Sequence, residues 1–288
     1  MKLLFTECNM GIAGDMLLSA LLDLFEDKES VIEELNSLGI PDVTYHLEQK
    51  ETCGIYGTHV RVLVGDQEEH SMDEHDHHGH HHHHQHEEDH HGHHHHHHEG
   101  EAHHHGHHHH HHDHGHSHSH AGMEEITQII DALEISSKAK EDAKAVYRRI
   151  ADAESKVHQK PVTEIHFHEV GSKDAIADIV GCAVLMEKLG ADHMVCSPIV
   201  TGFGKVKCAH GILPVPAPAT ALLLENVPSL AGQEEGELAT PTGVALATYY
   251  AESFEQRPMM NIRKIGYGMG SKEFRTANCV RVFLGDTL

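Results

Sequence analysis

The chain has 288 residues and a formal charge of −24 with neutral histidines, from 45 acidic and 21 basic side chains. This excess of negative charge argues against binding to nucleic acid or to acidic membrane surfaces. The apolar runs fall short of the roughly 20 residues that a membrane-spanning helix needs, and the first residues lack the apolar core of a signal peptide. The six cysteines are scattered with no C-x-x-C pair, which indicates reduced thiols and a cytoplasmic protein.

The spacing of apolar residues predicts strands and helices that alternate along the chain. Before residue 66 it predicts a strand at 2–6, helices at 16–25 and 30–38, and a hairpin of 43–51 with 55–64 that turns around Gly54. After residue 122 it predicts, in order, helices at 126–133 and 137–157, a short strand at 164–169, a helix at 174–189, a strand at 194–200, helices at 219–225 and 240–254, and a strand at 278–284. We therefore expect one domain of α/β or mixed α+β class, formed by residues 1–65 and 123–288.

Residues 70–120 hold 31 of the 38 histidines, with nine acidic residues and no lysine or arginine. Neutral imidazole binds nickel, zinc and copper at cellular pH, and the acidic neighbours favour capture of a cation. The predicted ligands include two unbroken blocks, namely His93, His94, His95, His96, His97, His98, His107, His108, His109, His110, His111 and His112. Because almost no apolar residue supports a core, residues 66–122 are predicted to be a disordered inserted loop. A purification tag and a pH-sensing linker are the alternative interpretations.

A second group of candidate ligands surrounds the predicted strand at 164–169. On a strand, His166 and His168 project to the same face, and Asp174 and Asp178 share one face of the next helix. With Glu169, these imidazoles and carboxylates suit a divalent metal, alone or beside a general base. The alternative is that the aspartates cap or solvate the helix and that one histidine packs in the core.

Several loops carry further candidates, each with an ordinary structural alternative. Cys208 and His210 place a soft thiol beside an imidazole, although free cysteines are more often buried apolar residues. Asp15 either binds metal or favours the start of its helix. The glycine-rich segment before Lys205 and the helix start at Thr240 suit a phosphate, or are a plain turn and an N-cap. The chain has no G-x-x-x-x-G-K-[ST] loop, which argues against a GTPase metallochaperone.

Taken together and in this order, the motifs resemble the LarC family of nickel insertion proteins over almost the whole chain. The matching segments are Gly-Ile-Ala-Gly-Asp-Met at 11–16, the histidine-rich insert, His-Phe-His-Glu-Val-Gly at 166–171 with Asp174 and Asp178, Cys-Ala-His-Gly-Ile-Leu-Pro-Val-Pro at 208–216, Glu237 with Thr-Pro-Thr-Gly at 240–243, and Gly-Tyr-Gly at 266–268.

The resemblance implies delivery of Ni(II) to pyridinium-3,5-bisthiocarboxylic acid mononucleotide, in which two thiocarboxylate sulfurs and ring carbon C4 bind the metal. The product is the nickel-pincer nucleotide of lactate racemase-type client enzymes, and the family uses CTP with Mg(II) or Mn(II). Two departures stand out. The segment Glu7-Cys8-Asn9-Met10 replaces an Asp-x-Phe-Ser run, and family members continue into a C-terminal region associated with CTP binding. We therefore expect CTP and its metal to act through a C-terminal LarC-type partner, and we expect a homo-oligomer.

The resemblance also suggests roles for the candidates. Forming the nickel–carbon bond requires a base for the ring proton, which we place among His166, His168, Glu169 and His210. The substrate phosphate is expected near Lys205, Lys207, Thr240 and Thr242. The metal ligands expected outside the histidine blocks are Asp15, Asp174, Asp178 and Cys208. A non-catalytic nickel or zinc storage protein and a metal-dependent hydrolase using His166, His168, Asp174 and Asp178 remain the alternatives.

Overall fold

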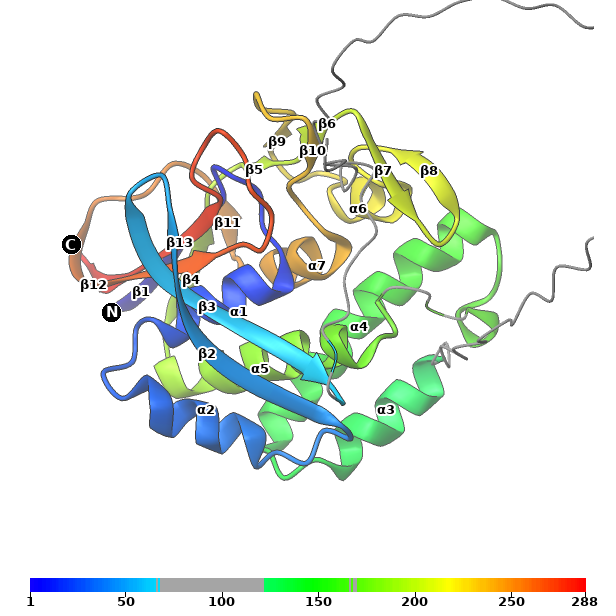
Figure 1. The fold of residues 1–288 in the computed structure, drawn as a ribbon, viewed down its shortest axis with the longest axis horizontal. Helices are drawn as coiled ribbons and strands as arrows, with labels where there is room; N and C mark the ends of the chain where they lie inside the picture. Colours follow the sequence, from blue (N-terminus) through cyan, green and yellow to red (C-terminus); the bar gives the residue numbers. More distant parts are fainter. Residues whose placement is uncertain (66, 68–121, 166, 168–169) are drawn as a thin grey trace, which may run out of the picture. The chain divides into compact units, whose positions relative to one another are not determined.

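A mixed β-sheet organises the part of the chain that the computed structural model describes, residues 1–65, 67, 122–165, 167 and 170–288. Seven strands lie in the order β11-β4-β1-β13-β12-β3-β2 (Figure 1). They are β1 (Lys2–Glu7), β2 (Val43–Thr52), β3 (Ile55–Val64), β4 (His193–Cys196), β11 (Ser253–Phe254), β12 (Met260–Met269) and β13 (Cys279–Thr287). Strand β1 runs parallel to β4 and antiparallel to β13, so segments from both ends of the sequence meet in the middle of the sheet.

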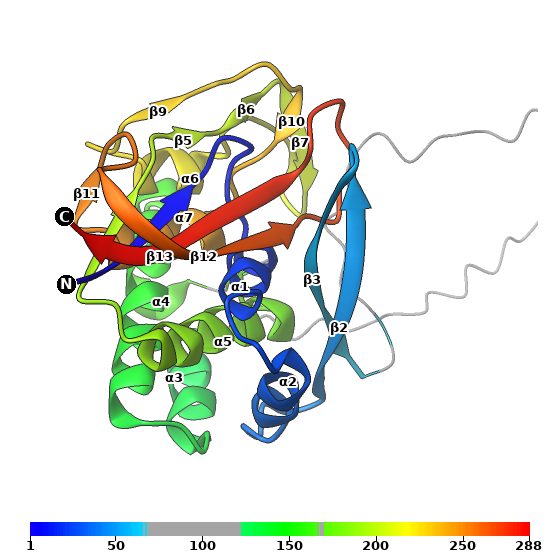
Figure 2. The ribbon, with the colours of Figure 1, turned by 90° about the vertical axis from the view of Figure 1, so that its left-hand side faces the viewer.

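Helices pack in layers against this sheet. They are α1 (Gly14–Leu22), α2 (Lys28–Asn36), α3 (Met123–Ala132), α4 (Ser137–His158), α5 (Lys173–Leu189), α6 (Pro218–Leu223) and α7 (Pro241–Tyr250). Helix α1 contacts β3, β12 and β13, α5 packs on α1, and α4 packs on α5 (Figure 2). Both α4 and α5 begin at serine N-caps, Ser136 and Ser172, whose side chains accept a backbone hydrogen bond. The architecture confirms the predicted mixed α/β class.

Two glycines explain how closely α1 lies on the sheet. Gly266 and Gly268 sit within β12, where a side chain would normally project towards the helix. A Cβ atom at Gly266 would collide with the backbone oxygen of Ala20, and one at Gly268 would collide with that of Met16. Glycine inside a strand often marks such a close approach of another backbone. These residues therefore set the distance between α1 and the sheet.

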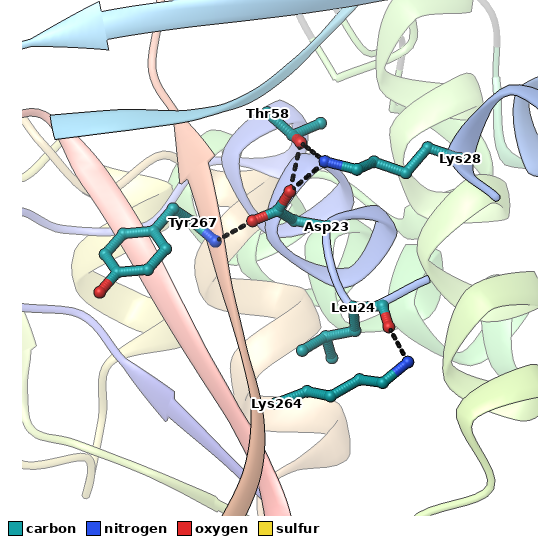
Figure 3. A network of polar contacts seen from close by, with 6 residues as sticks. All are labelled: Asp23, Leu24, Lys28, Thr58, Lys264 and Tyr267. Carbon is teal, nitrogen blue, oxygen red and sulfur yellow. Dashed lines mark hydrogen bonds and ion pairs between the residues drawn. The ribbon is translucent and has the colours of Figure 1, made fainter. Parts of the chain in front are cut away.

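The turn after α1 is fastened to two strands by one carboxylate (Figure 3). Asp23 Oδ1 accepts hydrogen bonds from Lys28 Nζ at 2.5 Å and from Thr58 Oγ1 at 2.6 Å, while Oδ2 accepts one from the Tyr267 backbone N–H at 2.9 Å. Lys264 Nζ adds a bond of 3.1 Å to the Leu24 carbonyl. Because the register of β3 with β12 consists of the pair Thr58 and Gly268, Asp23 reinforces a short contact between these strands.

Three short two-stranded ladders follow β4 and shape the region around the site. They are β5 (Ile199–Val200) with β9 (Ser229–Leu230), β6 (Gly202–Phe203) with β10 (Gly236–Glu237), and β7 (Lys205–Cys208) with β8 (Gly211–Pro214). The strand predicted at 194–200 is therefore divided between β4 and β5. The division has a topological reason, because β4 pairs with β1 whereas β5 pairs with β9.

The short strand predicted at 164–169 is wrong over the residues that are described. Val162–Glu164 form a 3-10 turn, η1, and Ile165 and Phe167 belong to no strand. Pro161 directly precedes the turn, and its fixed φ favours a tight turn at this point. His166, His168 and Glu169 lie outside the described residues, as do residues 68–121, which make up nearly all of the predicted insert. No helix in the described ranges is both long enough and apolar enough to cross a membrane.

Candidate functional site

A cavity of about 160 Å³ lies between α4, the start of α6 and the β7–β8 hairpin. Its walls combine apolar side chains with thiol, imidazole and carboxylate groups. The lining residues are Glu154, Val157, His158, Val170, Val206, Cys208, His210, Leu213, Ala217, Pro218, Ala219, Glu237 and Pro241. The two predicted residues Cys208 and His210 thus share one cavity with two side chains from α4 that the sequence did not single out, Glu154 and His158.

The hairpin fixes which of its side chains face the cavity. Cys208 pairs with Gly211, so Ala209 and His210 form the two-residue turn between the strands. Side chains alternate along β7, and Val206 and Cys208 line the cavity while Lys205 and Lys207 are exposed to solvent. The structure therefore does not bring the two predicted phosphate-binding lysines into the cavity.

Helix α4 contributes Glu154 and His158 from its last turns. His158 Nε2 lies 3.3 Å from Glu154 Oε2, one helical turn earlier. The ring of His158 also packs on the ring of His210, with centroids 4.9 Å apart and planes inclined by 35°. At the cavity wall, the Glu154 carboxylate therefore contacts the His158 imidazole, which in turn packs on the His210 imidazole. The Glu-x-x-x-His spacing at the end of a predicted helix was the available sequence signal for this group.

The three predicted aspartate ligands meet elsewhere, where the first turn of α1 approaches α5. Burial raises the pKa of Asp178 well above its ordinary value, and the charges of Asp174 and Asp15 raise it further, although a hydrogen bond from the Asp15 backbone N–H opposes the shift. Burial also raises the pKa of Asp15, against the opposing charge of His59. None of these aspartates lines the cavity. In the described ranges, no three histidine, cysteine or acidic side chains are arranged to hold one metal ion.

The helix start at Thr240 serves the helix itself. Thr240 Oγ1 accepts a hydrogen bond of 3.2 Å from the Gly243 backbone N–H, which is an ordinary N-cap. Thr242 is buried, at 8 % exposure. The adjacent Pro241 reaches the cavity, so this helix start lies at the site even though the Thr240 hydroxyl caps the helix.

The remaining predicted site residues lie outside the described residues. They are His166, His168, Glu169 and the two histidine blocks, His93 to His98 and His107 to His112. Val170, which directly follows Glu169, lines the cavity.

The combination of thiol, imidazole and carboxylate groups around an apolar cavity is suited to a protein that handles a borderline or soft divalent metal. Comparison with known families agrees with this class. The profile of the nickel insertion protein family matches residues 4–287, and the chain belongs to that family.

Relatives in the family are similar along the whole length of this chain. A protein of Clostridium acetobutylicum is 39 % identical over 289 residues, and one of Clostridium kluyveri is 36 % identical over 287 residues. Both are named pyridinium-3,5-bisthiocarboxylic acid mononucleotide nickel insertion protein. The match covers 99 % of this chain in both cases, but only 64 % and 62 % of the relatives, so the chain spans less than two thirds of their length. No solved structure matches the chain.

Proposed function

We propose that the chain inserts Ni(II) into pyridinium-3,5-bisthiocarboxylic acid mononucleotide, which yields the nickel-pincer nucleotide of lactate racemase-type client enzymes. The observation that carries the proposal is the cavity lined by Cys208, His210 and Glu237, in a chain whose relatives are named for this acceptor. Nickel is here the cargo of the reaction.

The walls of the cavity suit the acceptor chemically. Its apolar side chains favour a flat heteroaromatic ring, and the carboxyl groups of Glu154 and Glu237 favour the positive pyridinium nitrogen and the incoming cation. Thiocarboxylate sulfur is softer than imidazole and competes well with it for Ni(II). Once the sulfurs hold nickel, the positive charge acidifies the nearby ring C–H, and a base can remove its proton.

The individual roles follow the expectations from the sequence. His166, His168, Glu169 and His210 are the candidate bases, and the histidine blocks capture and buffer nickel. Cys208, Asp15, Asp174 and Asp178 are candidate metal ligands. Lys205, Lys207, Thr240 and Thr242 are candidate phosphate contacts, and Thr240 directly precedes Pro241, which lines the cavity. CTP with Mg(II) or Mn(II) would act through a C-terminal LarC-type partner in a lyase-class insertion, carried out by a cytoplasmic homo-oligomer.

The direct test is product formation. The chain is incubated with the mononucleotide, Ni(II), Mg(II) and CTP, with and without the C-terminal partner, and the nickelated nucleotide is measured by mass spectrometry. We expect product in the complete mixture and none without nickel. Absence of product in every mixture, together with no saturable binding of the mononucleotide in calorimetry, refutes the proposal. Unchanged product formation by His168→Ala refutes the assignment of a base role to that residue.

A non-catalytic nickel or zinc store is the second candidate, favoured by the histidine-rich stretch alone. A store does not need the cavity, whereas an insertion enzyme does. The two candidates therefore differ in whether nickel insertion remains when the histidines of residues 70–120 are removed.

A further inference from the structure

His158 is placed for proton transfer by contacts on two sides of its ring. It comes from the last turn of the 22-residue helix α4 and lines the cavity, with its side chain 30 % exposed. Glu154 lies 3.3 Å from its Nε2 atom, and the ring of His210 packs on it at a centroid distance of 4.9 Å. One ring edge therefore faces a carboxylate and one ring face is covered.

This arrangement selects the nitrogen that remains for chemistry. A carboxylate beside Nε2 favours the tautomer of the imidazole that carries its proton on that nitrogen. Nδ1 is then the nitrogen that accepts a proton in the neutral ring. Glu154 is thus a positioning residue for His158, and both are fixed by a long helix rather than by a loop, which holds a catalytic group more accurately.

We infer that His158 is a catalytic residue that accepts the proton lost from ring carbon C4 as nickel binds there. The inference rests on the proposed function. In this step the electron pair of the C4–H bond becomes the nickel–carbon bond, and the proton passes to Nδ1 of His158. Nickel remains Ni(II), so no oxidant or reductant is required. The partial exposure of the imidazole lets the proton leave to solvent afterwards.

The other titratable groups of the described lining are less suited to this step. Glu154 and Glu237 carry carboxylates, and a carboxylate is ordinarily a weaker base than an imidazole. Cys208 carries a soft sulfur that would compete with the acceptor for nickel. His210 stands at the tip of a two-residue turn, so its position depends on the hairpin. His158 joins an imidazole to a carboxylate partner one turn earlier on the same helix.

The test measures insertion by the full chain in the complete reaction mixture with excess nickel. We expect His158→Ala to slow insertion by about 100-fold or more, since a positioned general base contributes on that order. Calorimetric affinity for the mononucleotide should stay within about threefold, a change of less than 1 kcal/mol. Imidazole added to the buffer should restore at least part of the rate to His158→Ala. In the wild type, an acceptor deuterated at C4 should react more slowly than the protonated one.

The controls separate this role from a structural one. His193→Gln is the matched control, because His193 also pairs with a carboxylate, Glu252 at 2.9 Å, but lies outside the cavity lining. It should keep full activity. His158→Gln preserves the size of the side chain, so its insertion rate replaces that of His158→Ala if the alanine variant does not fold.

The possible results distinguish failure of the His158 role from failure of the proposed function. If the wild type forms product and both His158 variants insert nickel at rates within about threefold of it, the change is less than one tenth of that expected for a general base. This result overturns the inference and leaves the proposed function intact. A slow His158→Ala variant that imidazole does not accelerate also overturns it. No nickelated product from the wild type under any condition removes both the proposed function and the inference.

Discussion

Replacing Asp23 by alanine should lower stability far more than its position on a surface turn suggests. The carboxylate accepts three hydrogen bonds, from Lys28, Thr58 and the Tyr267 backbone, and so joins the end of α1 to β3 and β12. Its side chain is 15 % exposed and that of Lys28 is 26 % exposed, so solvent replaces only part of what is lost. Alanine leaves the Tyr267 N–H without its acceptor.

The magnitude follows from these contacts. A hydrogen bond to a charged group contributes about 1.5–3 kcal/mol, but Lys28 keeps Thr58 as a partner and can reach water, so the three contributions do not add. We expect a loss of about 3 kcal/mol in the free energy of unfolding. For a domain of this size, each kcal/mol lowers Tm by about 2–4 °C, which gives a decrease of about 6–12 °C. Asp23→Asn keeps one acceptor oxygen and should lose about half as much.

The assay is urea unfolding followed by circular dichroism, with Glu26→Ala as the matched control. Glu26 belongs to the same turn and pairs with Lys264 at 3.3 Å, but its side chain is 91 % exposed. Its removal should cost no more than about 0.5 kcal/mol. If Asp23→Ala is no less stable than Glu26→Ala, the carboxylate does not fasten the turn to the sheet and this reasoning is refuted.

Three further predictions concern other parts of the molecule. Burial raises the pKa of Asp178, so the native state retains a proton that the unfolded chain releases above about pH 4. Metal-free wild type should therefore lose stability relative to Asp178→Asn as pH rises from 4 to 7. Urea midpoints measured across that range test the sign, and a constant difference would contradict it. Gly243→Ala places a Cβ against the Ile12 backbone and should cost about 1–3 kcal/mol in thermal unfolding, although alanine is the better helix former. An unchanged or raised Tm would contradict this. Deleting residues 70–120 should leave nickel insertion intact at excess nickel and reduce it at limiting nickel, and loss of all product at excess nickel would favour the storage alternative.

The sequence predicted those parts of the fold in which the local residue pattern is typical of the element that the folded chain forms there. The hairpin turn at Gly54 is an example, because both Cys53 and Gly54 adopt positive φ, as a tight turn between twisted strands requires. Strand β12 was missed because Gly266 and Gly268 resemble a loop in sequence. Their purpose is visible only once the backbone of α1 is seen to lie against them.

The site was predicted in part for a similar reason. Cys208 and His210 are neighbours in sequence, so their combined chemistry could be recognised without a structure. Glu154 and His158 precede them by about fifty residues on a helix rich in charged side chains, most of which face solvent. Only the packing of α4 beside the β7–β8 hairpin shows that this particular pair faces the cavity.

The pairing of β1 with β13 has a consequence for biosynthesis. Glu7 on β1 and its ion-pair partner Arg281 on β13 are separated by 274 positions. During translation, β1 therefore emerges from the ribosome long before either strand that will flank it, and its Leu-Leu-Phe run waits unpaired in the nascent polypeptide. Exposed apolar strands of this kind are prone to aggregate. The protein should therefore depend on chaperone protection until β13 has been synthesised.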